Sequence, residues 1–406
     1  MVLVLGCHVN GPLGSYAPGL AQELTRRGYT ISGASQHLGF IAHLDRWMRD
    51  QRLAVADLTD SVLDGYLAER RGAGYVNYRS MRAFAPLLGY LAPLGVLPVA
   101  PPVVLDPVAA VLERYRRFLV VERGLTASTA RGYVDAVRPF LAERAGPVGL
   151  DLAGLTGAEV TAFVVAVCPR RAVGSAKMIV TALRSLLGWL HLDGQLPVSL
   201  VGAVPSVAGW RLSGLPRGLE PDQLRRLLAG CDRRRACGRR DYAIMLMLSR
   251  LGLRAGEVAG LGLDDIDWRH GEITVRGKGN RAERLPLPVD VGAAVAGYLR
   301  HGRPTTAQGR SVFVRVKAPH RALTSAAVSN VVSDCAHRGG LGPIRAHRLR
   351  HTAATAMLRA GSPLAQVGQV LRHRSMLTTS LYAKVDRDAL AVLARPWPSA
   401  TSGGVS

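Results

Sequence analysis

The spacing of apolar residues along the first half of the chain predicts short amphipathic helices. Residues 26–47 read RRGYTISGASQHLGFIAHLDRW, and residues 122–143 read ERGLTASTARGYVDAVRPFLAE. At an offset of 96, Arg27-Gly28-Tyr29-Thr30 aligns with Arg123-Gly124-Leu125-Thr126. Further pairs, Leu58-Thr59 with Leu155-Thr156 and LGYL (88–91) with LGWL (187–190), drift to offsets of 97 and 99, as short loop insertions would cause. We therefore predict an internal duplication with four or five helices in each copy.

Two proline-bearing segments interrupt these patterns. LPVAPPVVLDP (97–107) separates the two copies, and SLVGAVPSVAGWRLSGLPRG (199–218) precedes a region of different pattern. Such segments are typical of joints between domains. We predict helical domains at residues 15–98 and 107–200 and a third domain at residues 216–398.

The third region mixes helical and strand patterns. Helices are expected at 221–231, at 240–253, where the sequence is almost wholly apolar at its centre, and at 255–263 after a tight turn. Alternating residues in GEITVRG (271–277) and RLPLP (284–288), joined by a turn at 278–283, predict a β-hairpin, and SVFVRV (311–316) predicts a third strand. A helix at 346–360 ends at Gly361, Ser362-Pro363 opens the next, and a short one surrounds Tyr382. The predicted fold class is mainly α with a small antiparallel β-sheet.

The charge of the chain indicates what kind of partner it binds. The formal net charge is +23, from 52 basic and 29 acidic residues. Residues 201–406 carry 32 basic and 14 acidic side chains, whereas residues 1–100 carry 9 and 7 and residues 101–200 carry 11 and 8. A positive excess concentrated in one half indicates binding to nucleic acid phosphates or an anionic membrane surface; a basic surface that only aids solubility is the alternative.

The remaining composition favours a cytoplasmic protein. No apolar run approaches the roughly 20 residues that span a bilayer. The five cysteines (Cys7, Cys168, Cys231, Cys237, Cys335) are scattered and lack Cys-x-x-Cys spacing, which suits a reducing compartment and argues against a zinc knuckle. We expect no membrane partner.

Four cationic or potentially cationic groups share one predicted helical turn. In HRLRHTAATAM (347–357), His347, Arg350 and His351 fall at positions i, i+3 and i+4 and therefore lie on one face. When charged they would repel one another, and a bound anion would relieve that repulsion. A two-histidine zinc site is the alternative; the absence of an adjacent glutamate and the flanking arginines argue against it.

Arg254, in LSRLGLRAGEVAGL (248–261), is another cationic residue for which an anionic partner must be found. Its apolar flanks place the turn against the core, where an arginine needs an anionic partner. That partner is either Glu257, in an internal salt bridge, or a phosphate held through two parallel hydrogen bonds.

Two further groups carry candidate proton and nucleophile chemistry. Lys278 is one of only four lysines among 52 basic residues, and its ammonium can give up a proton where arginine effectively cannot; a solvated turn lysine is the alternative. His373 stands nine residues before Tyr382. A pocket of cations would stabilise a phenolate and the charge on a pentacoordinate phosphorus, although a lone tyrosine on an amphipathic helix is more often part of the core.

Taken in order, these residues resemble the tyrosine recombinases, also called the phage integrase family. The resemblance rests on Arg254 in GLRAGEV, Lys278 on a hairpin, HRLRHT at 347–352, and His373 followed by Tyr382. It covers residues 215–395 with motifs, and residues 110–195 resemble the family's helical core-binding domain. Residues 15–98 resemble an extra core-binding domain, so that two helical SAM-like domains would precede an α+β catalytic domain. One departure is Arg372, where the family usually has glycine, and it could alter the turn between helix and loop.

The resemblance implies a DNA-strand transesterase that uses no metal and no other cofactor. Tyr382 would attack the scissile phosphodiester to form a 3′-phosphotyrosyl bond. Arg254 and Arg350 would grip the non-bridging oxygens, His347 and His373 would complete the pocket, and Lys278 would protonate the leaving 5′-oxygen.

The resemblance also implies partners and a setting. They are double-stranded DNA, further copies of the chain in a tetramer on two DNA sites, and accessory recombinases. The cytoplasmic protein would be associated with the nucleoid and would serve integration, excision or transposition of a mobile element. A type IB topoisomerase and a non-catalytic DNA-binding protein are the alternatives.

Overall fold

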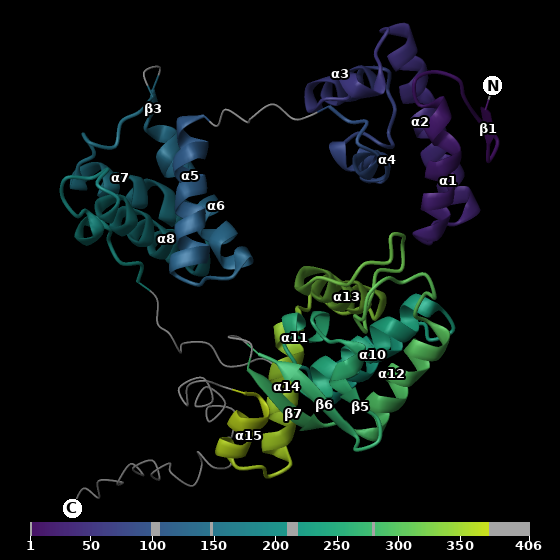
Figure 1. Cartoon of the computed structure of the whole chain (residues 1–406). Coiled ribbons are helices and arrows are strands. Elements are labelled where there is room, and N and C mark those ends of the chain that lie inside the picture. Colours follow the sequence, from purple (N-terminus) through teal and green to yellow (C-terminus); the bar gives the residue numbers. More distant parts are fainter. Residues whose placement is uncertain (1, 99–105, 147–148, 209–217, 278–280, 373–406) are drawn as a thin grey trace, which may run out of the picture. The chain divides into compact units, whose positions relative to one another are not determined.

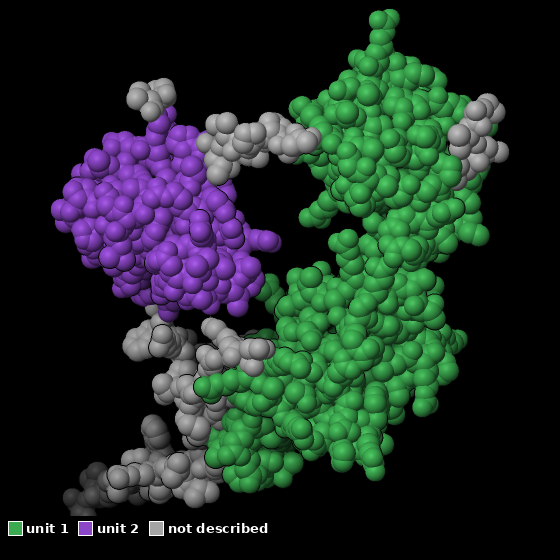
Figure 2. Space-filling model, in the orientation of Figure 1, with its two compact units in different colours: residues 1–99, 214–406 green, residues 100–213 purple. Residues whose placement is uncertain are grey.

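The computed structural model describes residues 2–98, 106–146, 149–208, 218–277 and 281–372 (Figure 1). The chain divides into two compact units, residues 1–99 with 214–406 and residues 100–213, coloured green and purple in Figure 2. The buried apolar residues form separate cores within residues 9–91, 108–204 and 219–349. The described structure is mostly helical with small antiparallel sheets, as predicted. The domain boundaries at 15–98, 107–200 and 216–398 stay a prediction.

Residues 2–98 form four helices and a short ribbon. The elements are β1 (Val2–Val4), β2 (Cys7–Val9), α1 (Ala17–Arg26), α2 (Ile31–Asp50), α3 (Asp60–Gly72) and α4 (Ala85–Leu91). Threonine hydroxyls cap two of the helices: Thr30 accepts from the Gly33 N–H at the start of α2, and Thr59 accepts from the Val62 N–H at the start of α3.

Residues 106–208 also form four helices. The elements are α5 (Pro107–Arg117), extended by a π-helical turn (Phe118–Glu122), α6 (Ala127–Glu143), β3 (Ala145–Gly146), β4 (Gly149–Leu150), α7 (Gly157–Val167) and α8 (Val173–Leu192). Thr126 caps α6 and Thr156 caps α7. These are the residues that the sequence alignment paired with the caps of α2 and α3. The duplication and the SAM-like assignment nevertheless stay predictions.

Residues 218–372 combine seven helices with a three-stranded sheet (Figure 1). The helices are α9 (Pro221–Ala229), α10 (Ala236–Arg250), α11 (Ala255–Ala259), α12 (Val289–His301), α13 (Ser325–Arg338), α14 (Ala346–Arg359) and α15 (Leu364–Val370). The antiparallel strands, in the order β5-β6-β7, are β5 (Ile266–Asp267), β6 (Glu272–Arg276) and β7 (Ala282–Pro286). Helix α10 is the centre of this core, because it packs against α12, α13 and α14.

The predicted hairpin is confirmed, whereas the predicted third strand is wrong. β6 and β7 pair from Glu272 with Pro286 to Arg276 with Ala282. Residues 311–316 make only isolated bridges, at Ser311 and Val314, and the third strand is β5 instead. Val312, Phe313 and Val314 are all fully buried, so this segment fills the core with consecutive side chains and does not alternate across a sheet. The short helix predicted around Tyr382 lies outside the described residues.

Within the described ranges, no helix is long and apolar enough to cross a membrane.

Candidate active site

Arg254 stands at the N-terminal end of α11 and is held by Glu257. Its backbone N–H donates to Glu257 Oε2 at 2.8 Å, and its Nη1 donates to Glu257 Oε1 at 2.6 Å. The turn packs against the core as expected, but the Arg254 side chain is 43% exposed while that of Glu257 is 4% exposed. The neighbours Leu253 and Val258 take the buried positions. The guanidinium therefore keeps an accessible face beside its internal salt bridge.

Arg350 is the buried arginine of the site. The residue is 2% exposed, and its guanidinium donates to the carbonyl oxygens of Gly252, at 2.5 Å, and Leu371. Gly252 has a φ of +59°, and a Cβ there would lie 2.5 Å from Leu371 Cδ2, so the close approach requires glycine. Carbonyls disperse the arginine's charge without cancelling it. Arg350 is thus fixed in place and still cationic.

Arg372 also reaches Glu257, from the end of α15. Its Nη2 donates to Glu257 Oε2 at 2.7 Å, and both side chains are 4% exposed. Its backbone φ is +55°, the left-handed conformation that glycine adopts readily. Burial opposes ionisation of Glu257, but hydrogen bonds from Arg254 and the charge of Arg372 outweigh it and hold the pKa of the carboxyl below its usual value. One carboxylate therefore orders two arginines.

The two histidines of α14 meet each other directly. The rings of His347 and His351 lie 4.3 Å apart between centroids, edge to face. Desolvation, followed by the charges of Arg350 and Arg254, lowers the pKa of His347; desolvation, followed by His347 and Arg350, lowers the pKa of His351 to about 4. The repulsion expected between these groups therefore contributes to keeping the histidines uncharged. Both are neutral at pH 7, and a neutral imidazole can donate or accept a proton.

A single pocket of about 490 Å³ joins these groups. Arg254, His347 and Arg350 line it together, so the structure brings together three of the six predicted catalytic residues. Arg276 and Ser325, which the sequence did not single out, line it as well. Arg276 is the last residue of β6 and pairs with Asp265 at 2.5 Å. Its strand position gave no chemical signal, because an exposed arginine at a strand end is common on any surface.

The other three predicted residues, Lys278, His373 and Tyr382, lie outside the described residues. Lys278 directly follows Gly277, which lines the pocket, and His373 directly follows Arg372. Their proposed roles remain predictions.

The described residues include no group of three or more histidine, cysteine, aspartate or glutamate side chains placed to hold a metal ion. His347 and His351 instead face arginine charges, which disfavour a divalent cation. What the pocket fits is an anion, since Arg254, Arg276 and Arg350 line it with His347, against the single carboxylate of Glu257. Guanidinium groups grip phosphate oxygens through charge-assisted hydrogen bonds.

Comparison with known proteins identifies the class. The Phage integrase family matches residues 217–388. "Putative integrase/recombinase y4rA" of Sinorhizobium fredii (strain NBRC 101917 / NGR234) is 39% identical over 393 residues, which cover 96% of this chain and 95% of that protein. Tyrosine recombinase XerD of Listeria monocytogenes serotype 4b (strain F2365) is 30% identical over 281 residues, covering 68% of this chain and 94% of that protein.

Solved structures show the same fold. The XerH site-specific recombinase bound to a palindromic difH substrate has a TM-score of 0.55 at 17% identity, covering 72% of this chain and 97% of that one. A lambda integrase (75–356) dimer bound to a COC′ core site has a TM-score of 0.52 at 18% identity, covering 66% and 95%. The chain belongs to the phage integrase family, the tyrosine recombinases. It is accordingly a DNA-binding enzyme that cleaves and rejoins DNA strands.

Proposed function

We propose that the chain is a site-specific recombinase that works through a 3′-phosphotyrosyl intermediate and serves integration, excision or transposition of a mobile element. The observation that carries the proposal is the convergence of Arg254, His347 and Arg350 on one pocket. The name of the relative that matches 96% of the chain, an integrase/recombinase, supports the mobile-element role.

The proposed reaction exchanges one phosphoester for another. The phenolic oxygen of Tyr382 attacks the scissile phosphorus, its proton leaves to a base in the pocket, and the bond to the 5′-oxygen breaks. Lys278 supplies the proton that the departing 5′-oxygen takes up. A 5′-hydroxyl of another strand then attacks the phosphotyrosine, which restores the phosphodiester and the free tyrosine. No bond energy is lost to water, so no nucleotide or metal is needed.

The described residues have distinct parts in this scheme. Arg254 offers an accessible guanidinium face to one non-bridging oxygen, and the buried Arg350 offers a fixed charge to the other. Because Glu257 and two carbonyls hold these arginines before DNA arrives, they need little reorganisation as charge grows on the phosphorus. His347, neutral at pH 7, is suited to pass a proton or to hydrogen-bond a phosphate oxygen.

Binding and assembly extend the proposal to the whole chain. The excess of positive charge in residues 201–406 favours contacts to DNA phosphates, which fix position without reading sequence. We propose that the helical segments 15–98 and 107–200 bind the same duplex as core-binding domains, and that four chains act on two DNA sites. The segment DRDALAVLARPW (386–397), outside the described residues, is the candidate for docking on a neighbouring chain because Leu390 and Leu393 give it a small apolar face.

A nicked suicide substrate tests the chemistry. It carries an inverted repeat from the DNA that flanks the gene, with a nick that lets the 5′-hydroxyl fragment diffuse away after cleavage. We expect a covalent protein–DNA adduct with the wild type, retained in Tyr242→Phe and lost in Tyr382→Phe. Tyr242 is the matched control because it lies in α10, away from the pocket.

Three outcomes would overturn the proposal. An adduct that persists in Tyr382→Phe would assign the nucleophile to another residue. Relaxation of supercoiled plasmid without any product joining two sites would favour a topoisomerase, and stable binding without an adduct would favour a non-catalytic DNA-binding protein.

A further inference from the structure

Two thiols that are far apart in the sequence, Cys231 and Cys335, lie close together in the fold. Cys231 follows the end of α9, and Cys335 lies in the last turn of α13, 104 residues later. Their sulfur atoms lie 3.4 Å apart. Cys231 is 4% exposed and Cys335 is fully buried. The two side chains therefore share one enclosed site, and a third cysteine, Cys237, is only half-buried.

The backbone on both sides of this pair is held close by glycines. A Cβ at Gly230 would lie 2.6 Å from the Cys335 carbonyl oxygen, and a Cβ at Gly339 would lie 2.8 Å from the Arg226 carbonyl oxygen. The Arg226 guanidinium also donates to the carbonyl oxygens of Gly339, at 3.0 Å, and Gly340, at 2.7 Å. The short distance between the sulfurs is thus set by the surrounding structure.

Arg338 contributes to a difference in acidity between the two thiols. Its Nη2 lies 3.0 Å from Cys335 Sγ, and its Nε donates to the Gly230 carbonyl oxygen at 2.8 Å. The hydrogen bond from the Cys231 thiol lowers the pKa of Cys335 despite burial, with the Arg338 charge acting in the same direction, whereas the pKa of Cys231 is raised. Cys335 is thus the more acidic of the two thiols.

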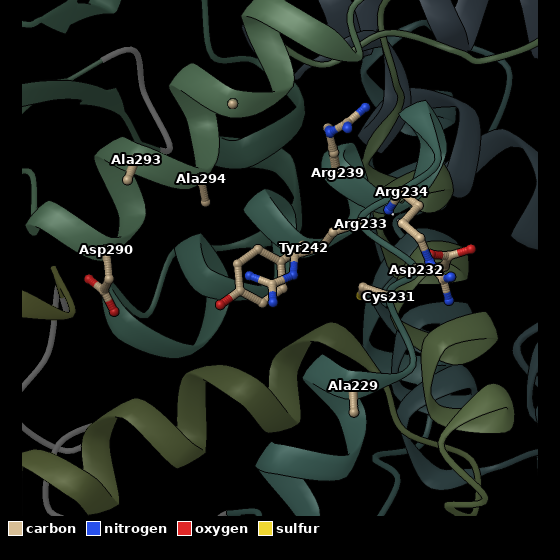
Figure 3. A pocket seen from close by; sticks show the side chains of 11 residues that line it. Ala229, Cys231, Asp232, Arg233, Arg234, Arg239, Tyr242, Asp290, Ala293 and Ala294 are labelled. Atoms are coloured by element: carbon tan, nitrogen blue, oxygen red, sulfur yellow. Dashed lines mark hydrogen bonds and ion pairs between the residues drawn. The ribbon is translucent and has the colours of Figure 1, made fainter.

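Small molecules have a route to Cys231. A pocket of about 860 Å³ between α9, α10 and α12 is lined by Cys231 together with Asp232, Arg233, Arg239 and Tyr242. Figure 3 shows the Cys231 side chain beside the labelled residues of this pocket. No residue that lines it also lines the pocket of Arg254 and Arg350. This site therefore stands apart from the proposed recombination chemistry.

We propose that Cys231 and Cys335 form a modification site that a small hydroperoxide converts into a reversible intramolecular disulfide. The Cys231 sulfur attacks the peroxide and breaks its O–O bond, and the thiol proton of Cys231 goes to the departing oxygen. Cys231 becomes a sulfenic acid and the peroxide leaves as an alcohol, or as water. The Cys335 thiol then attacks the sulfenic sulfur, and its proton leaves with the hydroxyl group as one water, so that two thiols lose two electrons and the peroxide gains them.

The geometry suits this product. A disulfide needs the sulfurs at about 2.05 Å, and the two sulfurs, already 3.4 Å apart, have little further to approach. A bond here would tie the end of α9 to α13. Helix α13 packs against α11 and α14, which carry Glu257 and Arg350. Oxidation would therefore restrict the movement of a helix that supports the active-site residues. In a reducing compartment such a bond would be transient, as redox-responsive disulfides are.

Peptide mapping of the full-length wild type under non-reducing conditions tests the proposal. The protein is treated with a small molar excess of hydrogen peroxide, alkylated and digested. We expect the peptide bearing Cys231 to be joined to the peptide bearing Cys335, at a mass two hydrogens below their sum, and to be released by dithiothreitol. The joined peptide should persist in Cys237→Ser and disappear in both Cys231→Ser and Cys335→Ser.

The wild-type measurement decides the matter even if a variant folds poorly. If peroxide oxidises Cys237 while Cys231 and Cys335 stay reduced, the pair is only a well-packed part of the core. If either cysteine instead accumulates as sulfinic or sulfonic acid, or pairs with a different thiol, the assignment of a paired site is wrong.

Discussion

The carboxylate of Glu257 serves two arginines at once, so its removal should have a large and specific effect. The change is Glu257→Gln, which keeps the shape of the side chain and removes its charge. Arg372, whose side chain is 4% exposed, would then lose its carboxylate and keep the hydrogen bond from its Nη1 to the Val370 carbonyl oxygen. Its Nε makes no hydrogen bond among the described residues even in the wild type. Arg254 would lose its ion pair as well. The variant therefore leaves a buried guanidinium without a counter-charge.

The expected cost follows from the burial of this pair. Breaking a buried ion pair by neutralising one partner costs about 3–5 kcal/mol of unfolding free energy. Because glutamine keeps one oxygen as an acceptor, we expect about 3 kcal/mol. For a domain of this size, that corresponds to a fall in melting temperature of roughly 6–12 °C.

Calorimetry with a matched control measures this cost. The control is Glu272→Gln, the same substitution in an exposed pair, since Glu272 and Arg284 lie 3.6 Å apart with side chains 41% and 79% exposed. It should cost under about 1 kcal/mol. The double variant Glu257→Gln with Arg372→Gly should recover part of the loss, because it removes the unpaired charge and places glycine at a φ of +55°. If Glu257→Gln is no more destabilising than Glu272→Gln, the buried network does not order the site.

Two other predictions concern proton chemistry. Lys278→Arg should retain DNA binding and lose cleavage by about 100-fold or more, because arginine cannot release its proton; a 5′-thiol leaving group should restore the reaction, and a normal rate on the oxygen substrate would remove Lys278 from the mechanism. For His351, the folded pKa of about 4 lies below the unfolded value of 6.5, so the unfolded state binds more protons and stability should fall as the pH drops through that window. The free energy of unfolding that is lost between pH 7 and pH 4.5 should be smaller in His351→Gln, by on the order of 2 kcal/mol. Urea unfolding at the two pH values measures this loss, and equal losses in both proteins would contradict the lowered pKa.

Local sequence signals predicted the elements whose residues have only local requirements. The helix end at Gly361 follows from capping chemistry, and the β6–β7 hairpin follows from alternation across one buried face. Residues 311–316 have the composition of a strand but fill a core position. That choice depends on which neighbours surround the segment, and no local pattern carries this information.

Of the six predicted catalytic residues, the pocket brings together three whose environments the sequence did not predict. Helical spacing placed His347 and Arg350 on one face of α14, and the pocket unites them with Arg254. The sequence could not show that Arg254 stays accessible while Arg350 is buried among carbonyls, since both stand in similar apolar surroundings. Nor could it show that Arg372 takes a left-handed backbone and returns to Glu257, because that contact joins residues 115 positions apart.

The hydrogen bonds that hold the Arg350 guanidinium have a consequence for biosynthesis. Its guanidinium donates to the carbonyl oxygens of Gly252 and Leu371. Gly252 is synthesised long before Arg350, and Leu371 is synthesised after it. During translation, a nascent chain therefore cannot complete the proposed phosphate receptor until Leu371 has left the ribosome and α15 has folded back. A chain that is still being made thus lacks one of the groups proposed for its chemistry.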